Sequence, residues 1–309
     1  MKLSRITLTI ATAAALLATA ACGNSGGDPL APSSTSGSGS AAAGGIIVGS
    51  ADFPESALLA EIYAGALEAK GVKVTKKLNI GAREAYIPAL QDGSIDLIPE
   101  YTGVLTQYFN KDAKATDSEG VYTELKAAVP DTLAVLDKSA AEDKDALVMK
   151  KSRADELGVK SIADLKGKSQ DLVIGGPPEW KTRLTGIPGF KKFYGLEFKQ
   201  FRPLDAGGPL TLQALKNGQI DAGDLFTTDP SIAENDLIAL EDPENMYAAQ
   251  NVVPLITKSK SNPTIEGALN AVSAKLDTAT LSALLKEVVS DKKDADTVAK
   301  DFLSKNGLG

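Results

Sequence analysis

The sequence predicts an α/β protein with two similar lobes, each a mixed, mostly parallel sheet flanked by helices. Two observations carry this prediction. From Ile46 onward, short apolar strand patterns alternate with amphipathic helix patterns, and this alternation is typical of parallel sheets covered by helices. In addition, the stretch Ala89–Thr102 is matched without a gap by Ala214–Thr227, in the pattern A-L-x-[D/N]-G-x-I-D-x-x-x-x-[Y/F]-T. The repeated stretch indicates two sibling halves that each supply one wall of a ligand site. The alternative is that helix, glycine and strand are a generic α/β succession and that the second copy matches by chance.

Each copy of the repeat is expected to form the end of a helix, a turn and a strand. A glycine follows the last apolar residues of the helix, where a left-handed backbone suits a C-cap. An Ile-Asp pair then opens the strand, and an aromatic-threonine pair follows where the strand ends. Ligands of open α/β sheets bind outside the carboxyl ends of strands, so we expect the aromatic residues to face a ligand and the aspartates to be structural. These residues are Gly93, Asp96, Tyr101 and Thr102 in the first copy and Gly218, Asp221, Phe226 and Thr227 in the second.

The other elements follow from apolar periodicity and turn residues. Strands are expected at 46–50, 72–75, 95–98, 132–136, 146–149, 171–174, 198–202, 237–240 and 252–256. Helices are expected at 54–70, 83–92, 104–109 and 121–129, in a segment ending at Gly158, around 179–183, and over 264–308. Lobe 1 is expected to hold 46–145 plus 229–309 and lobe 2 to hold 146–228. The charged stretch Glu142–Asp145 is expected to be a solvated loop at the first crossing between the lobes.

The first 45 residues are not expected to contribute to the core. A cationic start, the apolar run Ile6–Ala18 and small residues before Cys22 are typical of a signal peptide over 1–21 that ends at a bacterial lipoprotein processing site. Cys22 is the only cysteine, and its lipidation would anchor the protein on the extracytoplasmic face of the cell membrane. Residues 22–45, rich in Gly, Ser, Ala and Pro, are expected to form a flexible tether. Ordinary cleavage after Ala20 is the alternative.

Composition excludes several function classes. A formal net charge of −7 and the lack of a Lys/Arg-rich block argue against nucleic acid as a partner. The chain has no histidine, which removes His-based acid/base chemistry, Ser-His-Asp triads and His-containing zinc sites. We therefore expect no catalytic residue, metal or cofactor, and interpret the chain as a tethered solute receptor that acts as a monomer.

Several motifs resemble the substrate-binding proteins of osmoprotectant ABC transporters, the glycine betaine/choline/carnitine family. They are Gly49-Ser50-Ala51-Asp52-Phe53-Pro54-Glu55-Ser56, Asn79-Ile80-Gly81-Ala82-Arg83-Glu84, 96–103, 161–165, 179–183, 186–190 and 227–229. The resemblance covers essentially everything after the tether. It implies a periplasmic-binding-protein fold of type II, in which two lobes close over a small solute and present it to a permease and its ATPase.

The resemblance also implies a site. In that family a quaternary ammonium group sits in a box of aromatic rings, which suits a cation without hydrogen-bond donors, and an arginine binds its carboxylate. Tyr101 matches the first box tyrosine and Arg183 the carboxylate arginine, with Glu179 one helical turn before it and Trp180 beside it. Each has a structural alternative: Tyr101 and Trp180 as core rings, and Arg183 as a surface charge paired with Glu179.

Other positions depart from the family pattern. Ala51 replaces a lysine, Val104 replaces a threonine, and the remaining box tyrosines are replaced by Asp145, Leu212 and Phe226. Each lost aromatic contact weakens cation binding by roughly 0.5–2 kcal/mol. We therefore hypothesise that the fold and transport role hold but that the ligand differs or binds weakly. Asp145 and Asp52 would suit an amine that donates hydrogen bonds.

Two rival interpretations stay open at the level of sequence. A secreted hydrolase or transferase on the same scaffold could use a carboxylate pair such as Asp96 with Glu100. An envelope lipoprotein could instead bind other proteins or the cell wall. A receptor differs from the first in releasing its ligand unchanged, and from the second in closing its lobes over a ligand.

Overall fold

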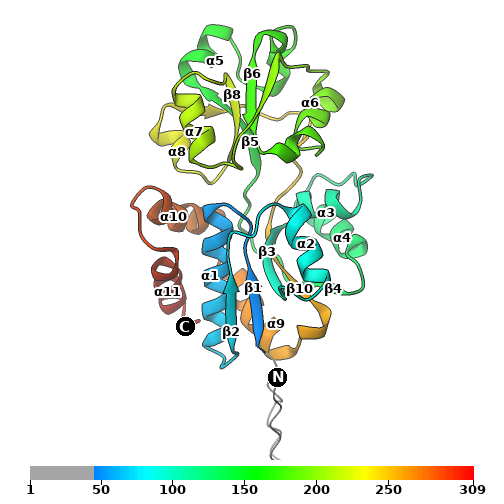
Figure 1. Ribbon diagram of the computed structural model, residues 1–309, viewed down its shortest axis with the longest axis vertical. Helices are drawn as coiled ribbons and strands as arrows, with labels where there is room; N and C mark the ends of the chain where they lie inside the picture. The colour runs from blue at the N-terminus through cyan, green and yellow to red at the C-terminus, as the bar shows by residue number, and fades with distance from the viewer. Residues whose placement is uncertain (1–44) are drawn as a thin grey trace, which may run out of the picture. The chain divides into compact units, whose positions relative to one another are not determined.

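A computed structural model describes residues 45–309, and there the chain forms two lobes, each built on a five-stranded sheet (Figure 1). The sheet of lobe 1 has the order β2-β1-β3-β10-β4. Its strands are β1 (Ile46–Gly49), β2 (Val74–Lys77), β3 (Leu97–Tyr101), β4 (Leu133–Val135) and β10 (Val252–Thr257). Its helices are α1 (Pro54–Glu68), α2 (Arg83–Gln91), α3 (Thr102–Phe109), α4 (Ser118–Ala128), α9 (Pro263–Ser273), α10 (Thr278–Val289) and α11 (Ala295–Lys305), with the short 3-10 helix η4 (Lys258–Lys260).

Lobe 2 repeats this plan with the strand order β7-β6-β8-β5-β9. Its strands are β5 (Asp145–Lys150), β6 (Val173–Gly176), β7 (Gln200–Pro203), β8 (Ala222–Phe226) and β9 (Leu237–Ala239). Its helices are α5 (Lys151–Leu157), α6 (Ile187–Tyr194), α7 (Pro209–Lys216) and α8 (Ser231–Glu234), with the 3-10 helices η1 (Ile162–Leu165), η2 (Ser169–Asp171) and η3 (Pro178–Lys181).

One strand in each sheet runs against its neighbours. Strand β10 is antiparallel to β3 and β4, and β5 is antiparallel to β8 and β9, whereas the remaining pairs are parallel. Each antiparallel strand is the one that enters its sheet from the other lobe. The mixed, mostly parallel sheets expected from the sequence are thus confirmed.

Helices cover both faces of each sheet, as the apolar strands require. In lobe 1, one core joins the sheet to α1, α9, α10 and α11, and a second joins it to α2, α3 and α4. In lobe 2, one core holds η1, η3 and α6, and the other holds α7 and α8. Successive residues of β3 and β8 therefore alternate between two buried faces.

The repeated stretch forms the same helix-turn-strand unit in both lobes. Helix α2 precedes β3 and helix α7 precedes β8, with Gly93 (φ 79°) and Gly218 (φ 66°) in the left-handed region between them. The Asp96 carboxylate accepts a hydrogen bond from the Ile47 N–H (2.8 Å). In lobe 2 the Asp221 carboxylate accepts one from the Val173 N–H (2.9 Å). Both aspartates join their strand to the adjacent parallel strand, which confirms their structural role.

The second crossing between the lobes comes later in the chain than the sequence analysis places it. Strand β9 (Leu237–Ala239) pairs with β5 in the sheet of lobe 2, so the segment after residue 228 still belongs to that lobe. The crossing follows β9 and reaches lobe 1 at β10. The sequence does not distinguish β9, which stays in lobe 2, from β10, which enters lobe 1, because both strands are short and apolar.

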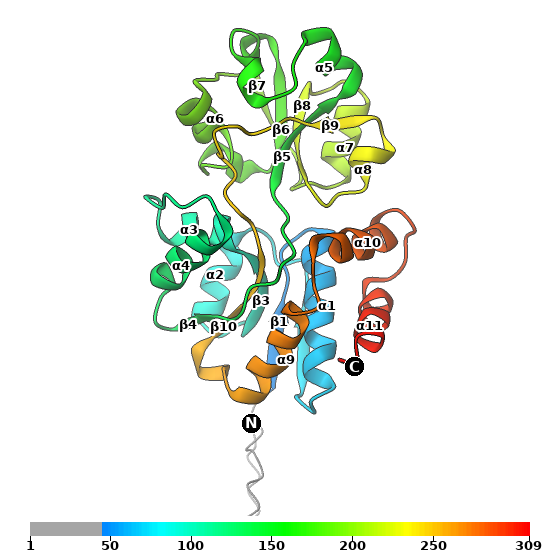
Figure 2. The same ribbon diagram turned by 180° about the vertical axis from the view of Figure 1, so that it is seen from behind.

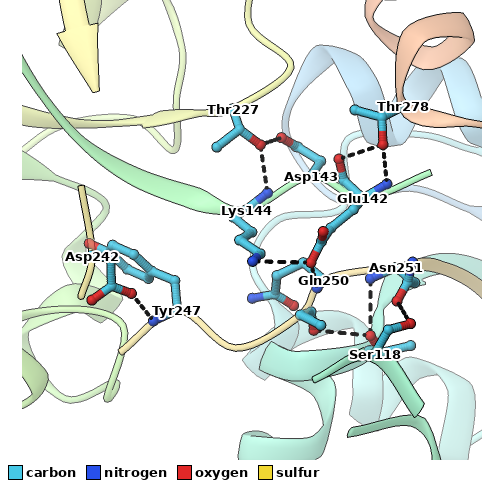
Figure 3. Close-up of polar contacts among 12 residues, drawn as sticks. Ser118, Glu142, Asp143, Lys144, Thr227, Asp242, Tyr247, Gln250, Asn251 and Thr278 are labelled. Carbon is cyan, nitrogen blue, oxygen red and sulfur yellow. Dashed lines mark hydrogen bonds and ion pairs between the residues drawn. The ribbon is translucent and has the colours of Figure 1, made fainter. Parts of the chain in front are cut away.

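The two crossings run side by side (Figure 2). The Asp143 N–H donates to the Gln250 carbonyl (3.1 Å), and Glu142 forms an antiparallel bridge with Asn251. Side chains reinforce this pair: the Gln250 N–H donates to Glu142 Oε1 (3.2 Å), which also lies 3.2 Å from Lys144 Nζ (Figure 3). The charged stretch is therefore not a solvated loop, because Asp143 is buried and Asp145 is the first residue of β5.

The expected signal peptide at 1–21, the lipidated Cys22 and the tether up to Gly44 lie outside the described residues. In the part of the chain that the structure does describe, no helix is both long enough and apolar enough to cross a membrane.

Candidate functional site

A cavity of about 340 Å³ lies between residues of lobe 1 and residues of lobe 2. Its lobe 1 wall includes the residues after β1, the start of α2 and the end of β3. Its lobe 2 wall includes the start of β5, the η3 segment, the loop before α7 and the end of β8. Its lining includes Asp52, Phe53, Arg83, Tyr86, Tyr101 and Val104 from lobe 1, Asp145, Glu179, Arg183, Asp205, Asp224 and Phe226 from lobe 2, and Asp143 and Gln250 from the crossings.

Three aromatic rings meet at this cavity. Phe53 lies between the two rings of the repeat, with its centroid 6.1 Å from that of Tyr101 and 5.1 Å from that of Phe226. Tyr101 and Phe226 thus approach the same site from corresponding positions, but they do so through Phe53 rather than across an open gap. In the sequence, Phe53 stands out only as a member of the motif Gly49–Ser56, with no role of its own. Gly207, in the left-handed region (φ 60°), lets its loop approach Phe226, because a Cβ there would lie 2.5 Å from the ring.

Glu55 connects the lobes behind the aromatic rings. Its carboxylate accepts a hydrogen bond from the Tyr101 hydroxyl (2.7 Å) and one from the Thr228 hydroxyl of lobe 2 (2.6 Å). Asp143, on the first crossing, accepts from the Thr228 N–H (3.0 Å) and the Thr227 hydroxyl (3.1 Å). Burial raises the pKa of Glu55, and burial together with the charge of Glu55 raises the pKa of Asp143. These contacts join lobe 1, the first crossing and lobe 2.

Arg183 lines the cavity, and its partner is in the other lobe. Its Nε and Nη2 bind Glu84 Oε1 (3.1 Å) and Oε2 (2.5 Å) at the start of α2. The alternative pairing with Glu179 is not formed; Glu179 lines the same cavity. Partial burial opposes ionisation of Glu84, but the hydrogen bond and charge of Arg183 outweigh it and hold the pKa of Glu84 below its usual value. The two side chains form a bidentate contact between the lobes.

Arg83, the other arginine that lines the cavity, forms an ion pair with Glu100 inside lobe 1. Its Nε and Nη2 bind Glu100 Oε1 (2.7 Å) and Oε2 (2.8 Å), and the Tyr86 hydroxyl donates to Glu100 Oε1 (2.7 Å). Glu100 is fully buried. The carboxylate pair suggested for a hydrolase, Asp96 with Glu100, is thus committed to structural contacts. Asp96 binds a backbone N–H, and Glu100 binds a guanidinium group.

Lobe 2 contributes carboxylates without such partners. Asp224, in β8, is 1% exposed, and neither carboxylate oxygen has a hydrogen-bond partner among the described residues. Asp145 opens β5 directly opposite Phe226, and Leu147 lies opposite Asp224. Because residues two apart on a strand share a face, Asp145 and Asp224 lie on the same face as diagonal neighbours. Burial, followed by the charge of Asp145, raises the pKa of Asp224 well above its usual value.

The structure brings most of the candidate residues together. Ala51, Asp52, Tyr101, Val104, Asp145, Glu179, Arg183 and Phe226 line the cavity. Four others are placed elsewhere and correct our expectation that they contact a ligand there. Thr102 is buried, and its hydroxyl donates to the Ala249 carbonyl and accepts from the Asn251 N–H. Thr227 binds the first crossing (Figure 3).

Trp180 and Leu212 are the other two candidate residues that lie outside the lining of the cavity. Trp180 is fully buried in the lobe 2 core, where it packs edge-on against Phe190 with centroids 5.6 Å apart. Leu212 faces a separate, smaller groove on the far side of Phe53 and Phe226. Spacing could not show this, because the lining of the cavity depends on which face of each element turns inward.

Sequence reasoning also missed several cavity residues: Phe53, Arg83, Tyr86, Asp143, Asp205, Asp224 and Gln250. For Asp224 a signal was present, since it stands two residues before Phe226 inside the repeat and is a charged residue within a predicted buried strand. For Gln250, which accepts from the Val104 N–H (2.9 Å), the sequence carries no signal because the residue lies on an irregular crossing. Among residues 45–309, no group of His, Cys, Asp and Glu side chains is arranged to hold a metal ion.

Two sheets of this topology, two crossings and a cavity lined from both lobes define a solute-binding protein of the periplasmic-binding-protein type II class. The family model for the substrate-binding domain of ABC-type glycine betaine transport systems matches residues 44–305. The chain belongs to this family.

Similar proteins agree with this assignment. A glycine-betaine-binding protein of Pseudomonas aeruginosa is 28% identical over 275 residues, covering 84% of this chain and 88% of that protein. The glycine betaine-binding protein YehZ of Escherichia coli is 27% identical over 280 residues, covering 86% and 92%. A solved structure titled glycine betaine/carnitine/choline ABC transporter shares the fold at a TM-score of 0.66 and 23% identity, covering 85% of this chain and 99% of that one.

Proposed function

We propose that this protein is the extracytoplasmic receptor of an ABC importer and that it captures a small cationic solute of the osmoprotectant class between its lobes. The observation that carries the proposal is the cavity itself. Rings from both lobes stand beside acidic side chains, and the two arginines that line the cavity are each bound to a carboxylate. A cation is the ligand whose charge this lining complements.

The ligand is not assigned by the names of the relatives. Of the positions where box tyrosines are expected, one is Asp145, which lines the cavity, and another is Leu212, which faces the separate groove. The rings that meet at the cavity are Tyr101, Phe53 and Phe226. This lining supports a receptor for a small amine other than glycine betaine as a second candidate within the same fold. Delivery to a membrane permease driven by an ATPase follows from membership of the family.

Calorimetry of the full-length protein with glycine betaine, choline, carnitine and less methylated amines tests the proposal. We expect saturable binding of at least one cation, a rise in melting temperature in proportion to the logarithm of its concentration, and recovery of the ligand unchanged. Chemical conversion of the ligand would contradict a receptor role. Absence of binding by every amine would contradict the proposed ligand class.

We propose further that the protein is a lipoprotein held at the outer face of the cell membrane through Cys22 and works as a monomer. The sequence before Ile46 is what supports the anchor. Metabolic labelling with a radioactive fatty acid should mark the wild-type protein and not the Cys22→Ser variant. Labelling of that variant, or release of the wild-type protein into the medium, would count against the anchor.

A further inference from the structure

Each lobe buries one carboxylate in the strand that ends at the cavity, and only one of the two has a counter-ion. In lobe 1, Glu100 is fully buried and bound by Arg83, Tyr86 and the Tyr101 N–H. In lobe 2, Asp224 is 1% exposed and unpartnered on both oxygens within the described residues. A buried carboxylate without a partner destabilises a fold when it is ionised. Such a group is typical of a functional site.

The groups around Asp224 leave its charge unbalanced. Asp224 lines the cavity together with Asp145, Asp143 and Asp205. The Asp205 carboxylate is already used at the start of α7, where it accepts from the N–H groups of Leu210 and Thr211 (2.8 Å each). Arg183 is committed to Glu84. The charge of Arg183 favours ionisation of Asp145 and Asp224, but no described side chain forms a hydrogen bond with the Asp224 carboxylate.

Two buried polar groups lie in the core beside Asp224. The Tyr247 hydroxyl makes no hydrogen bond to a described residue. The Trp180 indole N–H makes none of good geometry, but it lies close enough to the Asp145 carboxylate to oppose the rise that burial causes in the pKa of Asp145. A Cβ added at Gly176 would lie 2.9 Å from the Trp180 ring and 3.2 Å from the Asp224 Cβ, so Trp180 and Asp224 flank this glycine. Tyr247 is held in place through its backbone, since its N–H donates to the Asp242 carboxylate (2.8 Å) (Figure 3). Because Gly176 has no side chain, the Trp180 ring and the Asp224 side chain can both pack against its backbone.

We propose that Asp224 is the counter-ion of the ligand's cationic nitrogen and that this nitrogen carries at least one N–H. The assignment rests on the proposed function and names the chemical class of its ligand. A fully methylated ammonium group has no hydrogen to donate, and aromatic faces suit it best. A buried, unpartnered carboxylate instead gains most from a charge-assisted N–H···O hydrogen bond. Phe53, Tyr101 and Phe226 then pack the apolar part of the same ligand.

A methylation series tests this assignment. Choline, N,N-dimethylethanolamine and N-methylethanolamine are all cations at pH 7, and they differ in the number of N–H donors. We expect full-length protein to bind the dimethyl compound at least about tenfold more tightly than choline in calorimetry, the effect of one hydrogen bond to a charged group. In the Asp224→Asn variant this preference should disappear. The control variant Asp171→Asn removes the same charge from an exposed site in lobe 2 and should keep the preference.

The possible outcomes separate the ligand class from the broader function. Tighter binding of choline than of the dimethyl compound by the wild-type protein would overturn the assignment and leave the receptor function intact. An unchanged preference in Asp224→Asn would also overturn it, provided that circular dichroism shows the variant to be folded. Absence of binding by all three compounds would overturn the assignment, and the function on which it rests would fail as well only if glycine betaine and carnitine also do not bind.

Discussion

Asp224 is placed where its charge disfavours the folded, ligand-free protein. Its neighbours on the packed elements are the carboxylates of Asp145, Asp143 and Asp205, the cation of Arg183 and the hydroxyl of Tyr247. Burial is the largest cause of its raised pKa, and the charge of Asp145 is the next. A side chain that weakens the fold and lines a cavity is suited to binding rather than to packing.

We expect the Asp224→Asn variant to be more stable than the wild-type protein near neutral pH. The folded-state pKa of Asp224 lies above its unfolded value near 4. The wild-type free energy of unfolding therefore carries no penalty from Asp224 below pH 4, where the side chain is protonated in both states. This free energy falls as pH rises through the folded pKa, because the side chain loses its proton less readily in the folded protein. The free energy of unfolding of the variant should exceed that of the wild type by about 1–3 kcal/mol at pH 8 and should be nearly equal to it at pH 4.5. Urea unfolding at both values measures this, and an equal difference at both would contradict it.

Binding of a cation should release protons if Asp224 is its counter-ion. A carboxyl group with a raised pKa holds a proton part of the time, and a bound ammonium group favours the ionised form. Affinity should therefore rise with pH and level off above the raised pKa. Calorimetry in two buffers with different ionisation enthalpies counts the released protons. Their number should fall in Asp224→Asn, and an unchanged number would assign the release to another group.

Helix α2 and strand β3 are joined by a buried ion pair. Arg83 at the start of the helix binds Glu100 in the strand through two parallel hydrogen bonds. Burial opposes the charge of Arg83, yet the adjacent Glu100 outweighs it and raises the pKa of Arg83. This pair explains why Arg83 lines the cavity but is not free to bind an anionic group of a ligand.

Removing one member of this pair should be costly. We expect Arg83→Met to destabilise the protein by about 3–5 kcal/mol, because the Glu100 carboxylate is left buried without its counter-ion. Chemical denaturation measures the loss. The double variant Arg83→Met/Glu100→Gln serves as the control and should recover much of it, since no unpaired charge is then buried. A loss below about 1 kcal/mol in the single variant would mean that water reaches Glu100.

The elements themselves were largely predictable, and their assignment to lobes was not. Helix α2, strand β3, helix α7 and strand β8 occur where the repeat places them, because helix periodicity, a positive-φ glycine and a strand-opening aspartate are local signals. Strand β9 was assigned to the wrong lobe. Its partner β5 lies far from it in sequence, and a three-residue strand carries no mark of its partner.

At the scale of the whole molecule, the lobes are joined by the crossings, by Glu55 and by the Arg183–Glu84 pair. Glu55 and, on the first crossing, Asp143 are buried, whereas Glu84 has 49% and Arg183 25% of its side chain exposed. An exposed pair contributes about 0.2–1 kcal/mol and is screened by salt. This pair therefore biases the arrangement of the lobes, while the buried contacts hold the crossings together.

We expect Glu84→Gln to favour separation of the lobes without ligand. Small-angle scattering of ligand-free protein at low salt should give a larger radius of gyration for the variant, and high salt should reduce the difference. A saturating ligand should return both proteins to the same compact value. The variant Glu197→Gln, which removes a surface pair with Lys191 within lobe 2, should match the wild type. Identical scattering of all three proteins would show that the pair does not bias closure.

The sequence by itself determined the two-lobed α/β plan, the structural aspartates of the repeat and the convergence of Tyr101 and Phe226 on one site. These features are encoded locally, by periodicity and by residues that tolerate only certain backbone conformations. The tertiary structure alone decided that Phe53 joins the two rings, that Trp180 belongs to a core, and that Arg183 binds Glu84. It also decided that Glu100 is neutralised while Asp224 is not, because the counter-ion of a buried charge is set by which distant segments pack against it.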